Sequence, residues 1–249
     1  MVLGYNGTDF RGWAKQPEVR TVEGVLEDVL SRVLRERPTL SVAGRTDAGV
    51  HAEGQVASFA IDGRVDPSRI QRAVNGMLAP EIVVIRAGLA PSSFDARRSA
   101  RARQYRYRIN TAPVPNPFTA PFVWHRPSAL DVEAMRNAAE LLIGEHDFAS
   151  FCRAPKLPAS TVRTLRELLV AARGRHVVIT AKADSFLHQM VRSLVGTLVS
   201  VGDGNIDPES MPAILEARDR SAAGSVAPPH GLSLVRVTYA PSSRDGRRG

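Results

Sequence analysis

Apolar residues recur at intervals of three and four positions along much of the chain, which is the spacing of an α-helix. In the segment 22–34 they fill one side, which predicts an amphipathic helix with Thr21 as its N-cap. The segment 67–78 carries a similar stripe behind the pair Asp66–Pro67, a combination typical of a helix start. We therefore expect two amphipathic helices in the first third of the sequence.

The second half of the sequence contains three further helical segments. In the segment 131–144, Asp131 is a good N-cap and Gly144 is expected to stop the helix. The segment 185–202 is almost wholly apolar and predicts a long buried helix. The segment 207–217 starts with another Asp-Pro pair and predicts a shorter one.

Short segments of alternating or β-branched residues lie between the helices and predict strands. They are 39–44, 55–61, 81–90, 101–110, 165–172, 176–183 and 231–240, in addition to the first residues of the chain. The segment 101–110 alternates strictly, so Tyr105 and Tyr107 are expected on one face of a strand and arginines on the other. The proline-rich residues 112–122 predict a loop.

The order of these elements predicts an α+β protein of two lobes, each an antiparallel sheet packed with helices. We place the N-terminal lobe at 1–98 and the C-terminal lobe at 99–240, with the boundary inside an arginine-rich segment. The basic end, 241–249, is expected to be a disordered tail. A chain of 249 residues is long enough for two such lobes.

The net charge of +8 and the excess of arginine over lysine point to a polyanionic partner. Guanidinium groups fork onto phosphates and stack on bases, so nucleic acid is the favoured partner. The lone cysteine, Cys152, excludes a disulfide framework and a cysteine-based zinc site. We expect neither a membrane span nor a signal peptide, and therefore a cytoplasmic location.

The most unusual segment is VAGRTDAGVHAEGQVASFAI, residues 42–61, in which Asp47 lies on a turn framed by Gly44 and Gly49. Loops held by a sheet often carry reactive groups, and glycines allow uncommon backbone angles and close approach of a ligand. As a nucleophile or base, Asp47 needs a nearby cation to stay ionised, from Arg45 or from elsewhere in the chain. The same pattern also fits an ordinary turn in which the aspartate bonds its own backbone.

Three other features of the sequence have two interpretations each. His51 and Glu53 suggest a metal site with Asp47, but the spacing matches no standard ligand set, and we expect no metal. Tyr105 is either a core residue or an aromatic on which an unpaired base stacks. Arg192 lies inside the apolar segment 185–202, where its charge must pair with a carboxylate or extend to solvent.

Six blocks of the sequence occur in the order found in the TruA family of tRNA pseudouridine synthases, which the chain resembles over about residues 2–240. They are YNGTDFRGWAKQP, VAGRTDAGVHAEGQVASF, ARQYRYRI, GEHDFASFC, SFLHQMVRSLVGTLVSVG and GLSLVRV. The element GRTDAGVHA is the most specific of them. Asn6 stands where the family usually has aspartate, outside the central motif.

This resemblance implies the pseudouridine synthase fold, with an active-site cleft between the lobes, and an enzyme without cofactor or metal. It implies isomerisation of uridine to pseudouridine at positions 38, 39 or 40 of the tRNA anticodon stem-loop by a homodimer. Asp47 would be the nucleophile, Tyr105 would stack on the uracil, Arg192 would pair with Asp47, and Arg45 would help hold the base flipped out. Further arginines are expected to contact the RNA backbone: Arg11, Arg97, Arg98, Arg101, Arg103 and Arg106.

Two other classes of function fit parts of the sequence. A non-catalytic RNA-binding protein would use the same basic surface and aromatic strand, but it would leave uridine unchanged and would not need Asp47 beside Arg192. A metal-dependent hydrolase would be built on Asp47, His51 and Glu53, and it would lose activity in excess chelator.

Overall fold

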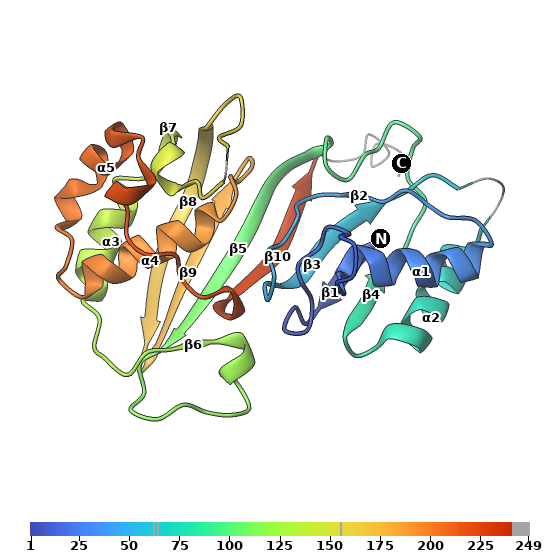
Figure 1. Ribbon diagram of the computed structural model, residues 1–249, viewed down its shortest axis with the longest axis horizontal. Helices are drawn as coiled ribbons and strands as arrows, with labels where there is room; N and C mark the ends of the chain where they lie inside the picture. The colour runs from blue at the N-terminus through green and yellow to red at the C-terminus, as the bar shows by residue number, and fades with distance from the viewer. Residues whose placement is uncertain (62, 64, 155, 241–249) are drawn as a thin grey trace, which may run out of the picture.

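The computed structural model describes residues 1–61, 63, 65–154 and 156–240 (Figure 1), so the expected tail lies outside the described residues. Its helices are α1 (Val22–Leu34), α2 (Pro67–Leu78), α3 (Val132–Glu140), α4 (Met190–Gly202) and α5 (Met211–Ala217). Its strands are β1 (Val2–Tyr5), β2 (Ser41–Val42), β3 (His51–Ser58), β4 (Ile82–Arg86), β5 (Ala100–Asn110), β6 (Trp124–His125), β7 (Gly144–Asp147), β8 (Val162–Arg173), β9 (His176–Ala183) and β10 (Leu232–Tyr239).

The strands form one continuous sheet in the order β4-β1-β3-β10-β5-β9-β8-β7, with β2 added to β3 and β6 added to β5. The α+β class is confirmed, but the two expected sheets are joined. The join is a parallel pairing of β10 with β3, through Ser233 opposite His51 and Leu234 opposite Ala52. On its other side β10 is antiparallel to β5, so the last described strand lies in the middle of the sheet.

A glycine permits this join. A Cβ atom added to Gly54 on β3 would lie 2.3 Å from the carbonyl oxygen of Val235 on β10, far inside contact distance. Any larger residue at position 54 would push the two strands apart. The glycine at position 54 of the segment 42–61 is therefore required by the pairing of β3 with β10.

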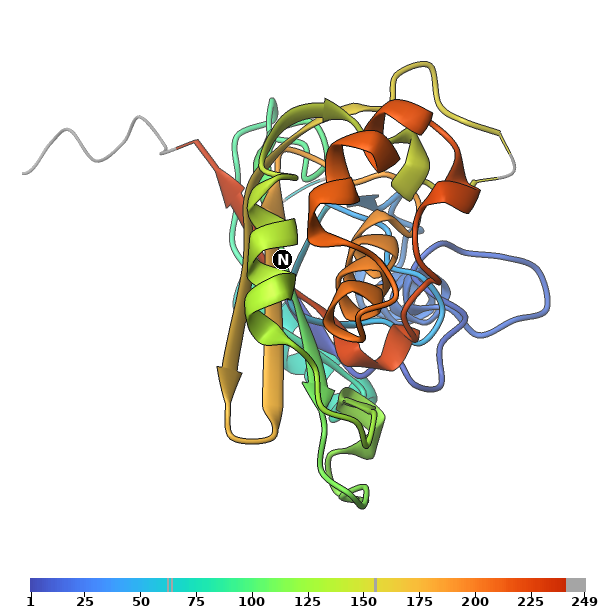
Figure 2. The same cartoon turned by 90° about the vertical axis from the view of Figure 1, so that its left-hand side faces the viewer.

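Helices of the C-terminal half cover one face of the sheet (Figure 2). On β9 the alternate residues Val177, Ile179, Ala181 and Ala183 are buried, while those between them are partly exposed or exposed. This is the alternation expected of a sheet packed on one side only. Helix α4 is buried nearly all round, and among the described residues no helix is both long and apolar enough to span a bilayer.

The N-terminal half carries α1 and α2, and both helices begin where the sequence predicts. The hydroxyl of Thr21 accepts the N–H of Gly24 at 3.2 Å, and the carboxylate of Asp66 accepts the N–H of Ser68 at 2.9 Å. Each helix turns an apolar stripe inward, and the stripe of α1 consists of Val22, Leu26, Val29 and Leu30. Cap and periodicity agree at both sites, which is why the prediction succeeds.

Three helices are shorter than the sequence predicts, and one of them, α5, begins only at Met211 because Pro208–Ser210 form a 3-10 turn. Helix α3 ends at Glu140, and Gly144 instead begins β7 with a φ of 129°. The predicted helix 185–202 begins only at Met190, because Gln189 has a left-handed φ of 56°. Residues 185–189 are therefore a loop, and this loop faces the cavity described next.

Candidate active site

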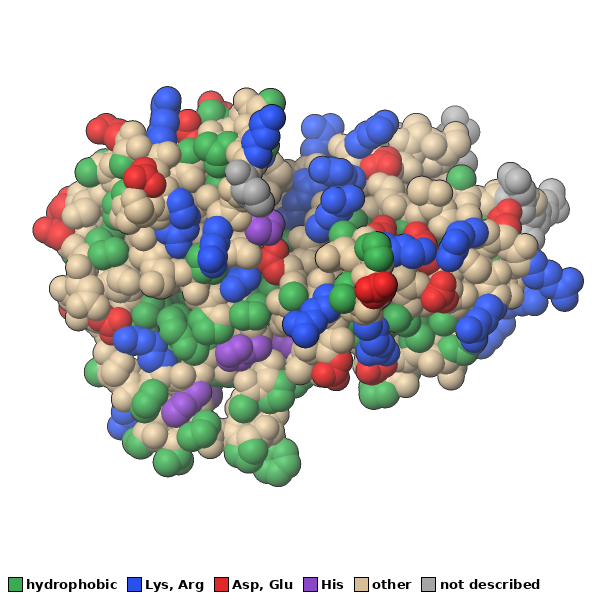
Figure 3. All heavy atoms as spheres, viewed as in Figure 1, with side chains coloured by type: hydrophobic (Ala, Val, Ile, Leu, Met, Phe, Trp, Pro, Cys, Tyr) green, Lys and Arg blue, Asp and Glu red, His purple; other side chains and the backbone are tan. Residues whose placement is uncertain are grey.

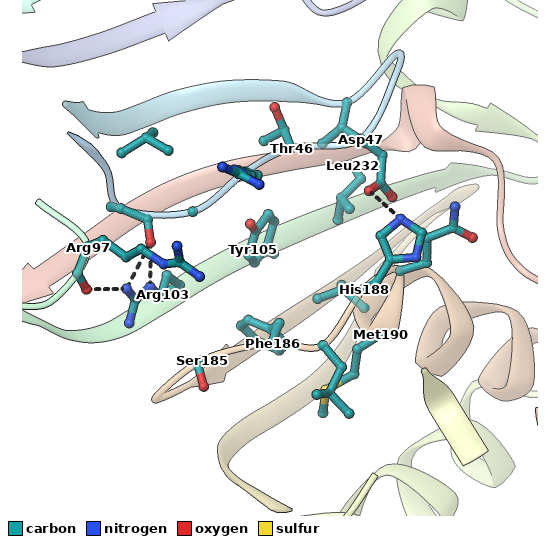
Figure 4. Close-up of a pocket in the computed structure, with 18 of the residues that line it drawn as sticks. Thr46, Asp47, Arg97, Arg103, Tyr105, Ser185, Phe186, His188, Met190 and Leu232 are labelled. Atoms are coloured by element: carbon teal, nitrogen blue, oxygen red, sulfur yellow. Dashed lines mark hydrogen bonds and ion pairs between the residues drawn. The ribbon is translucent and has the colours of Figure 1, made fainter. Parts of the chain in front are cut away.

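A cavity of about 620 Å³ lies at the junction of the two halves (Figure 4). It is lined by the loop after β2, by Tyr105 on β5 and by the segment 185–192. In Figure 3, Lys and Arg side chains gather around the hollow between the two halves. The cavity brings together all four residues for which the sequence suggested a role at the reacting base: Arg45, Asp47, Tyr105 and Arg192.

Buried side chains hold the start of the loop that carries Asp47. Arg103 on β5 donates to the carbonyl of Ala43 from Nε at 3.0 Å and from Nη2 at 2.8 Å. Gln55 on β3 donates from Nε2 to the carbonyl of Gly44 at 2.6 Å. Because these two side chains come from strands of the sheet, the sheet fixes where the loop begins.

The middle of the loop is held from the other side. The Tyr5 hydroxyl lies 2.8 Å from Thr46 Oγ1, and the Trp13 backbone N–H donates to the Thr46 carbonyl at 3.0 Å. Gly49 has a φ of 76°, as its place after the aspartate predicts, whereas Gly44 has no positive φ. The loop is thus held up to the residue before Asp47, and Asp47 lines the cavity.

Asp47 and Arg192 form an ion pair across the junction. Arg192 Nη1 lies 3.0 Å from Asp47 Oδ2, and the two side chains are 13% and 22% exposed. Arg192 Nε donates to the carbonyl of Ala227 at 2.8 Å, and the Ala227 N–H donates back to the Arg192 carbonyl at 3.0 Å. The guanidinium therefore does not extend to solvent but is oriented by backbone and aimed at the carboxylate.

His188 approaches the other oxygen of the same carboxylate, as the dashed line in Figure 4 shows. Its Nε2 lies 3.8 Å from Asp47 Oδ1, and the ring is half exposed to the cavity. No pattern in the sequence had marked this residue as part of the site. The sequence does place a histidine four residues before Arg192. This spacing indicates a position at the site only when residues 185–189 are known to be a loop and not part of α4.

Tyr105 forms part of the cavity wall and is 8% exposed. Its ring meets the Phe186 ring edge-on, with the centroids 5.3 Å apart. Burial, followed by the negative charge of ionised Tyr5 and of Asp47, raises the pKa of the Tyr105 hydroxyl above its ordinary value, so the phenol is neutral at physiological pH. Tyr107 is fully buried and donates its hydroxyl to the Pro228 carbonyl at 2.8 Å, which makes it a core residue.

The arginines expected on the RNA side do not all lie together. Five side chains are exposed: Arg11, Arg45, Arg97, Arg98 and Arg101. Of these, Arg45 and Arg97 line the cavity. Their exposure leaves all five cations accessible to phosphate groups.

Two of the arginines are engaged elsewhere. Arg103 is 9% exposed and its guanidinium is held by backbone carbonyls, among them that of Asp184 at 2.6 Å, so it supports the loop rather than presenting a charge to phosphate. Arg106 lies on the face of β5 opposite Tyr105, where it is 3.4 Å from Glu53. The strict alternation of the strand separates the two faces, as predicted, so Arg106 lies on the face away from the cavity.

Two further lining residues escaped the sequence analysis. Phe186 supplies the aromatic neighbour of Tyr105. Arg163 on β8 also lines the cavity, and its Nε is buried without a hydrogen-bond partner in the part of the chain that the structure describes. Phe186 lies within the quoted block SFLHQMVRSLVGTLVSVG and Arg163 lies in none of the six blocks, and nothing in the sequence marked either residue as part of the site.

Both ring nitrogens of His51 contact backbone groups, so this histidine has a structural role and is not positioned as a metal ligand. Its Nδ1 accepts the N–H of Gly7 at 2.9 Å, and its Nε2 lies 3.0 Å from the Pro121 carbonyl and 3.1 Å from that of His230. Burial lowers its pKa, which favours the neutral ring that these partners require. Glu53 pairs with arginines on the other face, and within the described ranges no three His, Cys, Asp or Glu side chains are grouped to hold a metal ion.

The fold and this site define an α+β protein with a fixed carboxylate–guanidinium pair in a cleft bordered by arginines. The chain matches the family model described as tRNA pseudouridine synthase over residues 2–97 and 138–240, which include both members of the pair. The chain belongs to this family of enzymes, as the motifs indicated.

Similar proteins are found across bacteria of several kinds. The tRNA pseudouridine synthase A of Frankia casuarinae is 48% identical over 244 residues, covering 96% of this chain and 88% of that protein. Those of Methylacidiphilum infernorum and Methylobacterium nodulans are 41% and 42% identical, over 97% and 96% of this chain and 95% and 94% of theirs. A chain of the Cbf5-Nop10-Gar1 complex is a distant structural neighbour, with a TM-score of 0.37 and 12% identity over 94% of this chain and 57% of that chain.

Proposed function

We propose that this protein isomerises uridine to pseudouridine at position 38, 39 or 40 of the tRNA anticodon stem-loop, with Asp47 as its nucleophile. The observation that carries the proposal is the pair of Asp47 and Arg192, held 3.0 Å apart at the edge of a cavity of about 620 Å³. A carboxylate paired with a guanidinium at a cavity is suited to nucleophilic catalysis.

The reaction needs no group from outside the chain. The bond from ribose C1′ to uracil N1 breaks, the base turns, C1′ bonds to C5, the proton on C5 leaves and N1 gains one. Asp47 serves this sequence by attacking C1′, by attacking C6 of the ring, or by assisting loss of the C2′ proton. Each route needs a charged carboxylate in a partly buried site, and the guanidinium of Arg192, 3.0 Å away, is its counter-ion.

The remaining residues of the cavity suit a base taken out of its stack. The face of Tyr105 offers a surface on which uracil can stack, and stacking on an aromatic contributes about 1–3 kcal/mol per base. Arg45 is exposed beside Asp47 in sequence and is placed to hold the extruded nucleotide. Phe186 backs Tyr105 and keeps its ring in place.

The exposed arginines bordering the cavity and the net charge of +8 support tRNA as the substrate. We further infer that the protein acts in the cytoplasm, where tRNA is matured, and as a homodimer on which one tRNA contacts both subunits. The size of the oligomer is tested by sedimentation with and without tRNA.

The test of the proposed function is modification mapping. Purified protein is incubated with unmodified tRNA transcripts, and pseudouridine is located by a chemical probe that reacts with it and not with uridine. The expected result is pseudouridine at 38, 39 or 40. Tight tRNA binding with no pseudouridine would instead favour a non-catalytic RNA-binding protein.

A further inference from the structure

A histidine outside the assigned set faces the reacting carboxylate. His188 lies in the loop before α4 and lines the cavity, with Nε2 3.8 Å from Asp47 Oδ1. Asp47 Oδ2 is the oxygen taken by Arg192, and within the described residues Oδ1 accepts no hydrogen bond. The oxygen left free to react with the substrate is therefore the one beside the imidazole.

One backbone contact favours a particular tautomer of His188. Nδ1 contacts the carbonyl oxygen of Arg153, and the N–H of Arg153 donates to the His188 carbonyl at 3.0 Å. A carbonyl oxygen can only accept, so in a hydrogen bond at this contact Nδ1 is the donor. In the neutral ring Nε2 is then a free acceptor that points toward the cavity.

The proposed reaction needs a proton acceptor, and the other titratable groups of the cavity are poorly suited to that role. Asp47 is engaged as the nucleophile and by Arg192. Glu23 accepts the backbone N–H of Lys15 at 2.8 Å. The Tyr105 hydroxyl is neutral because burial raises its pKa, and a neutral phenol is a weak base.

We propose that His188 is the base that removes the proton from C5 once C5 has bonded to C1′. This inference rests on the proposed function and adds a catalytic residue to it. In that intermediate C5 has four single bonds and C6 is double-bonded to N1. Nε2 takes the proton, the C5–H electron pair becomes the C5–C6 double bond, and the C6–N1 π pair moves onto N1. N1 then takes a proton from the imidazolium or from water, so no oxidant, reductant or metal is required.

The position of the ring fits this step. C1′ must reach Asp47 Oδ1 if the carboxylate attacks the sugar, and Nε2 lies 3.8 Å from that oxygen. C5 is one bond from C1′ in the intermediate, which brings its proton to the side of the cavity where Nε2 lies. A second role, in which His188 only orients Asp47, predicts a different result in the experiment below.

The sharpest variant is His188→Asn. The asparagine amide can donate to the Arg153 carbonyl as Nδ1 does, but nothing replaces Nε2. The measurement is single-turnover pseudouridine formation on tRNA transcripts made with uridine or with 5-deuterouridine, together with the Kd for tRNA and a thermal melt. The control is His176→Asn, an exposed histidine at the start of β9 that does not line the cavity.

With His188→Asn we expect the rate to fall by about 10²–10⁴-fold, the range for a lost general base. We also expect unchanged tRNA binding and melting, a deuterium isotope effect larger than that of the wild type, and partial recovery in added imidazole. His176→Asn should match the wild type in every readout.

Two results would overturn the proposal. A His188→Asn variant as fast as the wild type would show that no step uses Nε2. A slow variant whose isotope effect equals that of the wild type, with no recovery in imidazole, would make His188 a positioning residue for Asp47. If the wild type itself makes no pseudouridine, the proposed function fails instead, so the two failures are told apart.

Discussion

The guanidinium of Arg192 and the carboxylate of Asp47 meet 3.0 Å apart although 145 residues separate them in the chain. One stands on the first turn of α4, the other on the loop between β2 and β3. The contact therefore ties the two halves of the protein together at the candidate active site, and several measurable consequences depend on it.

Asp47→Asn keeps the shape of the side chain and removes its charge. In the proposed role this removes the nucleophile and leaves the exposed arginines unchanged. Pseudouridine formation should therefore be abolished, while the Kd for tRNA should stay within about twofold, well under the roughly 1.4 kcal/mol that a tenfold change represents. Single-turnover assays and filter binding measure the two quantities. Turnover within tenfold of the wild type would mean that Asp47 is only a turn residue.

Arg192→Met leaves the Asp47 charge partly buried without its partner and also removes the bond to the Ala227 carbonyl. We expect activity to be lost and the free energy of unfolding to fall by about 1–3 kcal/mol, the usual cost of an unpaired buried polar group. Adding Asp47→Asn to this variant should recover part of the stability and none of the activity. Denaturant unfolding of both variants tests this, and a single variant as stable as the wild type would argue against a strong pair.

Tyr105→Phe and Tyr105→Leu separate stacking from proton transfer. With His188 as the base, the phenylalanine variant should keep most of the activity, because its ring still offers a stacking face. The leucine variant should lose roughly 1–3 kcal/mol of stabilisation of the bound base, measured as a lower kcat/KM. If the Tyr105→Phe variant is inactive while its tRNA binding is normal, the hydroxyl takes part in the chemistry. If the Tyr105→Leu variant is fully active, Tyr105 is only a core residue.

The exposed arginines can be tested against one on the opposite face. Arg97→Ala and Arg98→Ala should each weaken tRNA binding and reduce the slope of log K against log salt by about one. Arg106→Ala, on the opposite face of β5 and paired with Glu53, should leave the slope unchanged. Equal effects of all three would place RNA on both faces of the sheet.

The four tyrosines of the chain provide a pH test. Burial raises the pKa of Tyr5 to about 12 and moves those of Tyr105, Tyr107 and Tyr239 in the same direction. The folded state therefore binds more protons than the unfolded chain above roughly pH 10, the ordinary tyrosine value. Hence this contribution to stability is complete below about pH 10 and is lost as the pH rises further.

Phenolate absorbance during an alkaline titration checks this expectation. In the folded protein it should stay nearly absent at a pH where a denatured sample shows it fully, and it should rise together with unfolding. A titration of the folded protein that overlays the denatured one would contradict the burial of these hydroxyls.

Local signals predicted much of the fold. The caps Thr21, Asp66 and Asp131 each accept a backbone N–H at the predicted helix start, because cap and periodicity reinforce each other there. The alternation along β5 correctly separated Tyr105 from Arg106. The parallel pairing of β3 with β10 had no local signal, since it depends on a contact between residues far apart in sequence.

The sequence motifs predicted some residues of the site but not how the chain around them is folded. Asp47 and Arg192 could be named from the sequence, but His188 could not, because residues 185–189 continue the apolar pattern of α4 and were expected to be helical. The left-handed backbone of Gln189 ends that continuity and places His188 beside the carboxylate. Arg103 was expected at the RNA backbone because it lies in a basic segment of the sequence. In the structure its guanidinium instead donates to the Ala43 carbonyl and holds the start of the loop that carries Asp47.

The central place of β10 bears on the order in which a nascent chain can assemble. Residues 232–239 lie between β3 and β5, so the two halves have no shared sheet until this segment has left the ribosome. Until then Asp47 and Arg192 belong to parts of the chain not yet joined through the sheet, and pairing strands so distant in sequence is slow. The pair of Asp47 and Arg192 is therefore expected to form only after residues 232–239 have been made, and a chain truncated before Leu232 should have no activity.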